Sequence, residues 1–144
     1  MASVAHLFRA AQHRLPMAGL DQAEAIAAFG FTGCVHGKKN GVRQILLVDF
    51  ETLDAMGLEP GIIRENITTQ GLNVNSLVIG EQLRIGEALL QVSAVCTPCD
   101  QLELVRTGLR REIYGRRGML CRVVEGGTIR VGDAIERVVA AASD

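Results

Sequence analysis

The chain has 144 residues and a net charge of −1, with 48% hydrophobic and 22% charged residues. These values predict a folded chain with one core, and the near-neutral charge provides no overall field that would attract nucleic acid. Aromatic residues make up only 3% of the chain and tryptophan is absent, which disfavours the stacking platforms of single-strand binders. We therefore expect a single domain over residues 1–144 that does not bind nucleic acid.

Two features predict the cellular compartment. No run of eighteen apolar residues occurs, and the first fifteen residues lack the apolar core of a signal peptide. Four cysteines without such a signal predict reduced thiols, because the cytosol keeps disulfides open. We expect a cytoplasmic protein without a membrane association, in which thiol chemistry or metal binding is favoured over a disulfide framework. The oligomeric state is not predicted.

The amino-terminal part alternates between short apolar segments and glycine-rich loops. Residues 3–8 have the loose alternation of an opening strand. Asp21 and Glu24 resemble a capping pair, so local propensity favours a short helix over residues 21–30. Residues 30–41 are punctuated by glycine and have no apolar period, which predicts a surface loop.

A strand-to-helix unit follows this loop. Residues 43–48 are typical of a buried strand, and Asp49 is expected to cap a helix over residues 50–56 that Gly57 ends. Residues 62–69 are rich in β-branched and polar side chains, which indicates a strand near the edge of a sheet.

Two hairpins are predicted in the carboxyl-terminal half. Gly86-Glu87 joins alternating segments over residues 82–85 and 88–92, and residues 122–131 turn back through Glu125-Gly126-Gly127. Short strands about ten residues apart, with glycine turns between them, favour a closed or nearly closed β-barrel. The predicted fold class is therefore mainly β.

Apolar residues between the two hairpins recur at helical spacing and predict a single long helix that crosses the barrel. They are Leu102, Val105, Leu109 and Ile113. Pro98 fixes the turn before this helix, so Cys99 would stand at its first turn. The positive helix terminus and nearby arginines would then favour the thiolate, the nucleophilic form of cysteine.

Several motifs follow one another in the order of a known family. The segments RENITTQGLNVNSL, IGEQLRIGEALLQVS, TPCDQLE and GRRGMLCRVVEGGTIRVGD resemble a small stand-alone MOSC domain, named after the carboxyl-terminal part of molybdenum-cofactor sulfurases. The resemblance covers about residues 30–135. It implies a twisted β-barrel with a few helices and an extended segment over residues 21–29. We favour this extended segment over the local helix, because tertiary context overrides propensity.

The resemblance also implies a function. The family is thought to bind molybdenum cofactor or to carry sulfur as a cysteine persulfide, and some small relatives help to reduce N-hydroxylated compounds. We therefore expect a sulfur-carrier or cofactor-binding domain, with sulfurtransferase-like activity or a part in a molybdenum-dependent reductase. Its partner would be a cysteine desulfurase, another sulfur donor or an electron-transfer protein. Pyridoxal phosphate would belong to the partner, because the only lysines here are the adjacent loop residues Lys38 and Lys39.

Particular residues match the family motifs. The pocket cysteine corresponds to Cys99, as nucleophile or molybdenum ligand, and His36 to a proton donor. Arg43 and Asn66 match positions that would contact the cofactor. Members commonly have Gly-Asp-x-His where this chain has Gly33-Cys34-Val35-His36, so that a cysteine replaces an acid.

The arginines have two interpretations. Arg116 and Arg117 lie between glycines in a loop that is able to approach a ligand closely, and guanidinium groups suit a pterin phosphate. The helix arginines, Arg106 and Arg110, are instead expected on a solvated face, with Glu103 paired to Arg106 and Glu112 to Arg116.

Other interpretations of the cysteines stay open. Cys96 and Cys99 form a Cys-x-x-Cys that fits a thiol–disulfide protein, although Cys96 at a strand end favours a core position. A zinc site would have to draw on scattered ligands, and Cys121 in an apolar strand is expected to be buried and inert. A non-catalytic binding module is the remaining alternative.

Overall fold

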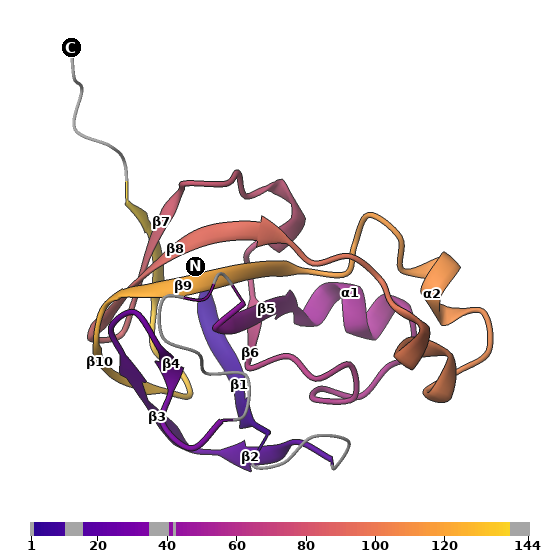
Figure 1. The fold of residues 1–144 in the computed structure, drawn as a ribbon, viewed down its shortest axis with the longest axis horizontal. Coiled ribbons are helices and arrows are strands. Elements are labelled where there is room, and N and C mark those ends of the chain that lie inside the picture. The colour runs from indigo at the N-terminus through magenta and orange to yellow at the C-terminus, as the bar shows by residue number, and fades with distance from the viewer. Residues whose placement is uncertain (1, 11–15, 35–40, 42, 139–144) are drawn as a thin grey trace.

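The computed structural model describes residues 2–10, 16–34, 41 and 43–138, and the described chain is mainly β, as predicted (Figure 1). The strands are β1 Ser3–Arg9, β2 Ala18–Leu20, β3 Gln22–Ile26, β4 Gly30–Phe31, β5 Ile45–Asp49, β6 Ile67–Gln70, β7 Gln82–Ile85, β8 Ala88–Val95, β9 Met119–Glu125, β10 Gly127–Arg130 and β11 Ile135–Val138. The α-helices are α1 Phe50–Ala55 and α2 Leu109–Glu112, and the 3-10 helices are η1 Val74–Ser76 and η2 Asp100–Leu104.

The strands form two sheets. One has eight strands in the order β11-β7-β8-β9-β5-β6-β1-β2, and the other has three in the order β10-β3-β4. Neighbouring strands are antiparallel except for β5 and β6, which are parallel. An isolated bridge, Ser3 with Ala134, joins β1 to the segment before β11, and three backbone hydrogen bonds accompany it, namely Val4 N to Asp133 O, Gly132 N to Val4 O and Ile135 N to Ala2 O. No strand ladder of the described residues closes the sheet, so the predicted closed or nearly closed barrel is not confirmed in detail.

Strand β5 separates two hydrophobic clusters because successive side chains of a strand point to opposite faces. Ile45 and Leu47 belong to the larger cluster, which lies among the strands. Leu46 and Val48 belong to the smaller one, which holds Leu53 of α1 as well as residues of η2 and α2. The strand thus packs the helical end of the molecule against the sheets, and all of its residues are buried.

Most predicted elements of the first half are present. β1 begins the chain, and residues 22–26 are the extended segment β3 that the family resemblance implied in place of a helix. Asp49 caps α1 through its Oδ2 atom, which accepts a hydrogen bond from the backbone N–H of Thr52 at 3.3 Å. Gly57 follows α1 in the left-handed conformation, with φ at 67°. These local signals therefore predicted the strand-to-helix unit correctly.

The predicted edge strand over residues 62–69 is wrong. β6 begins only at Ile67 and lies between β5 and β1, with residues 67–69 buried. Before it, the carboxylate of Glu65 folds the chain into a tight loop, because its Oε2 atom accepts from Gly61 N at 2.7 Å and from Thr68 Oγ1 at 2.9 Å. Polar side chains in this stretch therefore form a buried loop rather than a solvated edge.

One predicted hairpin is confirmed and the other is wrong. β7 and β8 pair across Gly86-Glu87, with Ile85 opposite Ala88. β10 does not pair with β9 but crosses to the second sheet and pairs with β3. A Cβ atom on Gly126 would lie 2.7 Å from Ala25 O, so that glycine is what lets the chain cross so close to β3.

The predicted long helix is also wrong. Residues 100–104 form η2 and residues 109–112 form α2, with Gly108 between them at φ 86°. This left-handed residue breaks the helical path, and the carboxylate of Glu103 accepts from the backbone N–H groups of Gly108 at 2.9 Å and Arg110 at 3.0 Å. The apolar spacing nevertheless marked core positions correctly, because three of its four members are buried. They are Leu102, Leu109 and Ile113.

Candidate functional site

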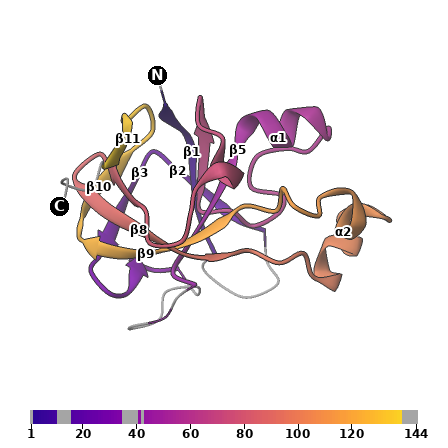
Figure 2. The same ribbon diagram turned by 90° about the horizontal axis from the view of Figure 1, so that it is seen from above.

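The Cys-Thr-Pro-Cys segment and the Gly-Arg-Arg-Gly loop leave the same end of the β8–β9 ladder. Val95 pairs with Met119 at the end of that ladder, and the backbone N–H of Cys96 donates to Gly118 O at 3.0 Å. Figures 1 and 2 show η2 and α2 extending beyond this end, on the opposite side of the molecule from β3, β4 and β10. The predicted thiol and arginine groups therefore lie at one end of the fold.

The four cysteines differ in exposure. All four are free thiols, and Cys34, Cys96 and Cys121 are buried whereas Cys99 is exposed. Cys121 is fully buried, as predicted, and burial raises the pKa of its thiol far above the ordinary value. Cys96 is also in the core, as predicted, with 4% of its surface exposed. Cys99 is thus the only cysteine that a partner molecule is able to reach without a change of structure.

Cys99 occupies the N-cap position of η2, where its backbone carbonyl accepts from Leu102 N at 3.1 Å. Its side chain makes no capping hydrogen bond and remains available. Because η2 has only five residues, it does not supply the terminus of a long helix on which the predicted thiolate stabilisation depended. The local structure therefore makes the Cys99 thiol accessible to other molecules, but it does not place the thiol at the terminus of a long helix.

Arg117 is buried, with 8% of its surface exposed. Its Nη2 atom donates to Ile63 O at 2.9 Å, while Nε and Nη1 are buried and have no hydrogen-bond partner among the described residues. A buried cation with unused donors is costly unless an anion or water completes it. Arg116, by contrast, is exposed. The loop therefore places one arginine inward and one outward.

The arginines around α2 are held in surface pairs, as the solvated-face interpretation predicted. Arg106 donates to Met56 O at 2.8 Å and to Glu112 Oε2 at 2.7 Å, and Arg110 pairs with Asp100. The particular pairs predicted from a continuous helix, Glu103 with Arg106 and Glu112 with Arg116, are wrong. The break at Gly108 turns Glu103 toward backbone N–H groups instead.

Asn66 and Cys34 form a buried contact that sequence reasoning missed. Asn66 Oδ1 accepts from Leu46 N at 3.0 Å, and its Nδ2 atom donates to Phe8 O at 3.3 Å and to Cys34 Sγ at 3.4 Å. Cys34 Sγ also accepts from Ala10 N at 3.4 Å. The amide thereby joins β1, β5 and the segment after β4. The only sequence signal was the cysteine that replaces the family's acid.

The other predicted site residues are placed differently. His36 lies outside the described residues, and Arg43 is exposed at the start of the segment that leads into β5. Within the described ranges, no group of three His, Cys, Asp or Glu side chains is able to hold a metal ion. The Cys-Thr-Pro-Cys segment and the Gly-Arg-Arg-Gly loop are joined by the backbone hydrogen bond from Cys96 to Gly118, and the roles predicted for Cys99, Arg116, Arg117 and His36 stay predictions.

These features define a mainly β chain that has one exposed thiol, Cys99, and one inward-facing arginine, Arg117, in segments that leave the same end of the β8–β9 ladder. A model of the MOSC domain matches residues 35–136, more than half of the chain. The chain belongs to the MOSC domain family. A search of curated proteins finds no significant match. Among the described residues, no helix is long and apolar enough to cross a membrane.

Solved structures support the same fold. The YuaD protein from Bacillus subtilis superimposes with a TM-score of 0.80 at 22% identity, covering 94% of each chain. YiiM from Geobacillus stearothermophilus has a TM-score of 0.78 at 20% identity, over 99% of this chain and 77% of that one. YiiM from Escherichia coli has a TM-score of 0.67 at 20% identity, over 99% and 70%. Identities this low establish the fold alone.

Proposed function

We propose that the protein is a sulfur carrier that uses Cys99 as its persulfide-forming thiol. The observation that carries the proposal is that Cys99 alone among the four cysteines is exposed. Membership of the MOSC family supports the same class of function. The free thiols also fit a reducing compartment such as the cytoplasm.

The transfer step is a thiol–persulfide exchange. The sulfur of deprotonated Cys99 attacks the outer sulfur of a persulfide on a donor protein, such as a cysteine desulfurase. A new S–S bond forms on Cys99, the S–S bond of the donor breaks, and the electron pair leaves on the donor's thiolate. No external oxidant or reductant is needed, because the outer sulfur keeps its oxidation state. A pyridoxal phosphate that generates the persulfide would belong to the donor.

Molybdenum-cofactor binding is the second candidate function, and one observation favours it. The Nε and Nη1 groups of Arg117 are buried donors that have no partner in the described part of the chain, and a guanidinium with unused donors fits a phosphate group. Arg117 would hold the phosphate, with Arg116 and Arg43 as further cations, and the Cys99 sulfur would suit molybdenum. The bound cofactor would supply two-electron redox chemistry, with an electron-transfer protein as partner.

His36 and Asn66 have different parts in this proposal. His36 remains the proposed proton donor. Asn66 is fully buried and bound to Leu46, Phe8 and Cys34. We therefore propose that it contributes by holding the segment after β4 in place.

Intact-mass analysis after incubation with a cysteine desulfurase and cysteine tests the sulfur-carrier function. The wild type is expected to gain one sulfur atom that Cys99→Ser does not gain, whereas the control Cys96→Ser retains the gain because that thiol is buried. A gain that survives Cys99→Ser would contradict the proposal. Metal and pterin analysis of the purified protein tests the second candidate, for which equimolar molybdenum and pterin are expected.

Intact-mass analysis also distinguishes the sulfur carrier from the alternative of a thiol–disulfide protein. A protein that works through Cys96 and Cys99 would lose two hydrogens on mild oxidation and gain no sulfur. A non-catalytic binding module would show neither change.

A further inference from the structure

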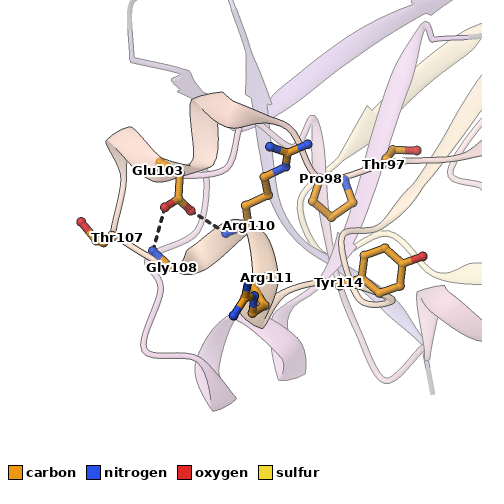
Figure 3. Close-up of a pocket in the computed structure, with 8 residues that line it drawn as sticks. All are labelled: Thr97, Pro98, Glu103, Thr107, Gly108, Arg110, Arg111 and Tyr114. Atoms are coloured by element: carbon orange, nitrogen blue, oxygen red, sulfur yellow. Dashed lines mark hydrogen bonds between the residues drawn. The ribbon is translucent and has the colours of Figure 1, made fainter.

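A surface groove of about 650 Å³ lies immediately beside the Cys99 segment. Thr97 and Pro98 form one wall, Glu103 comes from η2, and three side chains come from α2 and the residues after it (Figure 3). They are Arg110, Arg111 and Tyr114. Because Pro98 directly precedes Cys99, an occupant of the groove would lie next to the exposed thiol.

The polar groups of the groove are not equally available. The Glu103 carboxylate is occupied by the backbone N–H groups of Gly108 and Arg110, drawn as dashed lines in Figure 3. The Arg110 guanidinium pairs with Asp100. Arg111 is exposed, and its guanidinium group has no hydrogen bond or ion pair within the part of the chain that the structure describes. The charge left for a partner is therefore a positive one.

Large apolar side chains are exposed at the same end of the molecule. Leu104, at the end of η2, is 89% exposed, Tyr114 is 78% exposed and Val95, at the end of β8, is 58% exposed. Exposed apolar residues gathered with polar ones mark interaction surfaces, and tyrosine and arginine are the residues most often important in them. This part of the surface has the composition of a docking site for a protein.

The charge of this end differs from that of the whole chain. Residues 97–118 contain five arginines against one aspartate and two glutamates, whereas the chain as a whole has a net charge of −1. A local positive patch on an acidic protein attracts an acidic partner and accelerates its association. Charge complementarity thus favours an acidic segment as the occupant.

We propose that this groove docks an acidic segment of the protein that donates a persulfide to Cys99, with Arg111 as the charge contact and Tyr114 as the apolar one. The proposal rests on the sulfur-carrier function and names the surface through which its donor is recognised. A docked donor would present its persulfide beside Pro98 and Cys99. This arrangement converts a collision between two proteins into an oriented exchange.

The test compares two sulfur sources for the same thiol. A cysteine desulfurase with cysteine is a protein donor that needs docking, whereas sodium polysulfide loads the thiol without it. The rate at which Cys99 gains sulfur is measured by intact mass for the wild type, Arg111→Glu and Tyr114→Ala. Arg122→Glu is the matched control, since Arg122 is also exposed but lies on β9 in contact with Gln91.

Arg111→Glu is expected to lower the second-order rate from the desulfurase about tenfold or more and to weaken its dependence on salt. Tyr114→Ala is also expected to lower the second-order rate from the desulfurase. The rate of loading by polysulfide should equal that of the wild type in both variants. The control Arg122→Glu should keep the wild-type rate with the desulfurase.

Three results would overturn the docking proposal while leaving the carrier function intact. They are equal desulfurase rates for wild type and Arg111→Glu, equal losses in Arg111→Glu and Arg122→Glu, and loading by polysulfide with none from the desulfurase. Failure of both sulfur sources to load wild-type Cys99 would instead overturn the carrier function on which the docking proposal rests.

Discussion

The guanidinium group of Arg117 reaches back to the loop before β6, where its Nη2 atom donates to the carbonyl oxygen of Ile63 at 2.9 Å. Two further nitrogens of the same buried group have no partner among the described residues. The contact joins the Gly-Arg-Arg-Gly loop to Ile63, the residue directly before the Arg-Glu-Asn segment and fifty-four positions away in sequence. The fold thus holds the Arg117 guanidinium in a fixed orientation and leaves two of its N–H groups, Nε and Nη1, without a partner among the described residues.

An anion is therefore expected to stabilise the protein through Arg117. In urea unfolding, inorganic phosphate at ten times its Kd should raise the free energy of unfolding of the wild type by about 1.4 kcal/mol. Arg117→Met should remove this increment without lowering the stability of the phosphate-free protein by more than about 1 kcal/mol. Arg122→Met is the control and should keep the increment. An undiminished phosphate effect in Arg117→Met would show that the anion binds elsewhere.

Gly118 is expected to tolerate no side chain. Its φ is 113°, and an added Cβ atom would lie 2.4 Å from Leu47 O and 2.9 Å from Val48 Cγ2. Gly118→Ala should lower the free energy of unfolding by about 3 kcal/mol or more. Gly57→Ala should lower it by only about 1 kcal/mol, because Gly57 has a φ of 67° but open space around it. Denaturant titration of both variants measures the difference, and similar losses would refute the steric explanation.

Asn66→Ala is expected to lower the free energy of unfolding by about 2–4 kcal/mol, because it removes three hydrogen bonds of a buried side chain and leaves the N–H of Leu46 unpaired. Asn73→Ala is the control, since Asn73 is exposed and makes no side-chain cap hydrogen bond; its effect should stay within about 0.5 kcal/mol. Guanidinium unfolding followed by circular dichroism measures both. A loss below about 1 kcal/mol for Asn66→Ala would mean that water replaces the amide.

Glu81 is expected to contribute to the dependence of stability on pH. Hydrogen bonds from the Arg137 guanidinium hold the pKa of Glu81 below its ordinary value. A carboxylate with a lowered folded-state pKa stabilises the fold above its unfolded pKa of about 4.3, and the contribution is lost as the pH falls through the folded value. The stability difference between wild type and Arg137→Gln should therefore be constant near neutral pH and shrink below about pH 4. A difference that persists at pH 2 would contradict the ion pair.

Local patterns predicted the elements whose determinants lie next to each other in the sequence. The Asp49 cap, Gly57 after α1 and the Gly86-Glu87 turn each act within a few residues, and each is present in the structure. The hairpin through Gly126 failed because β10 pairs with β3, a hundred residues earlier in the chain. A hairpin signal in the sequence describes only two strands that follow one another. It does not show whether one of them pairs more stably with a strand from a distant part of the chain.

The candidate site shows the same division. Sequence pattern singled out Cys99 and the two arginines, but it did not distinguish Arg117, which is buried, from Arg116, which is exposed. The apolar spacing of residues 102–113 marked core positions correctly and the helix incorrectly, since the spacing takes no account of Gly108, whose left-handed φ ends the helical path. Burial depends on what packs from elsewhere, here the Ile63 loop and β5.

The sequence by itself determined the mainly β class, the family and the short local signals, because residue type and spacing along the chain encode them. Only the tertiary structure decided that Cys34 is buried while Cys99 is exposed, that Asn66 binds Cys34, and that a groove opens beside Pro98. These properties arise from hydrogen bonds and packing between segments far apart in the chain. Such contacts are made only when the folded chain brings those segments together.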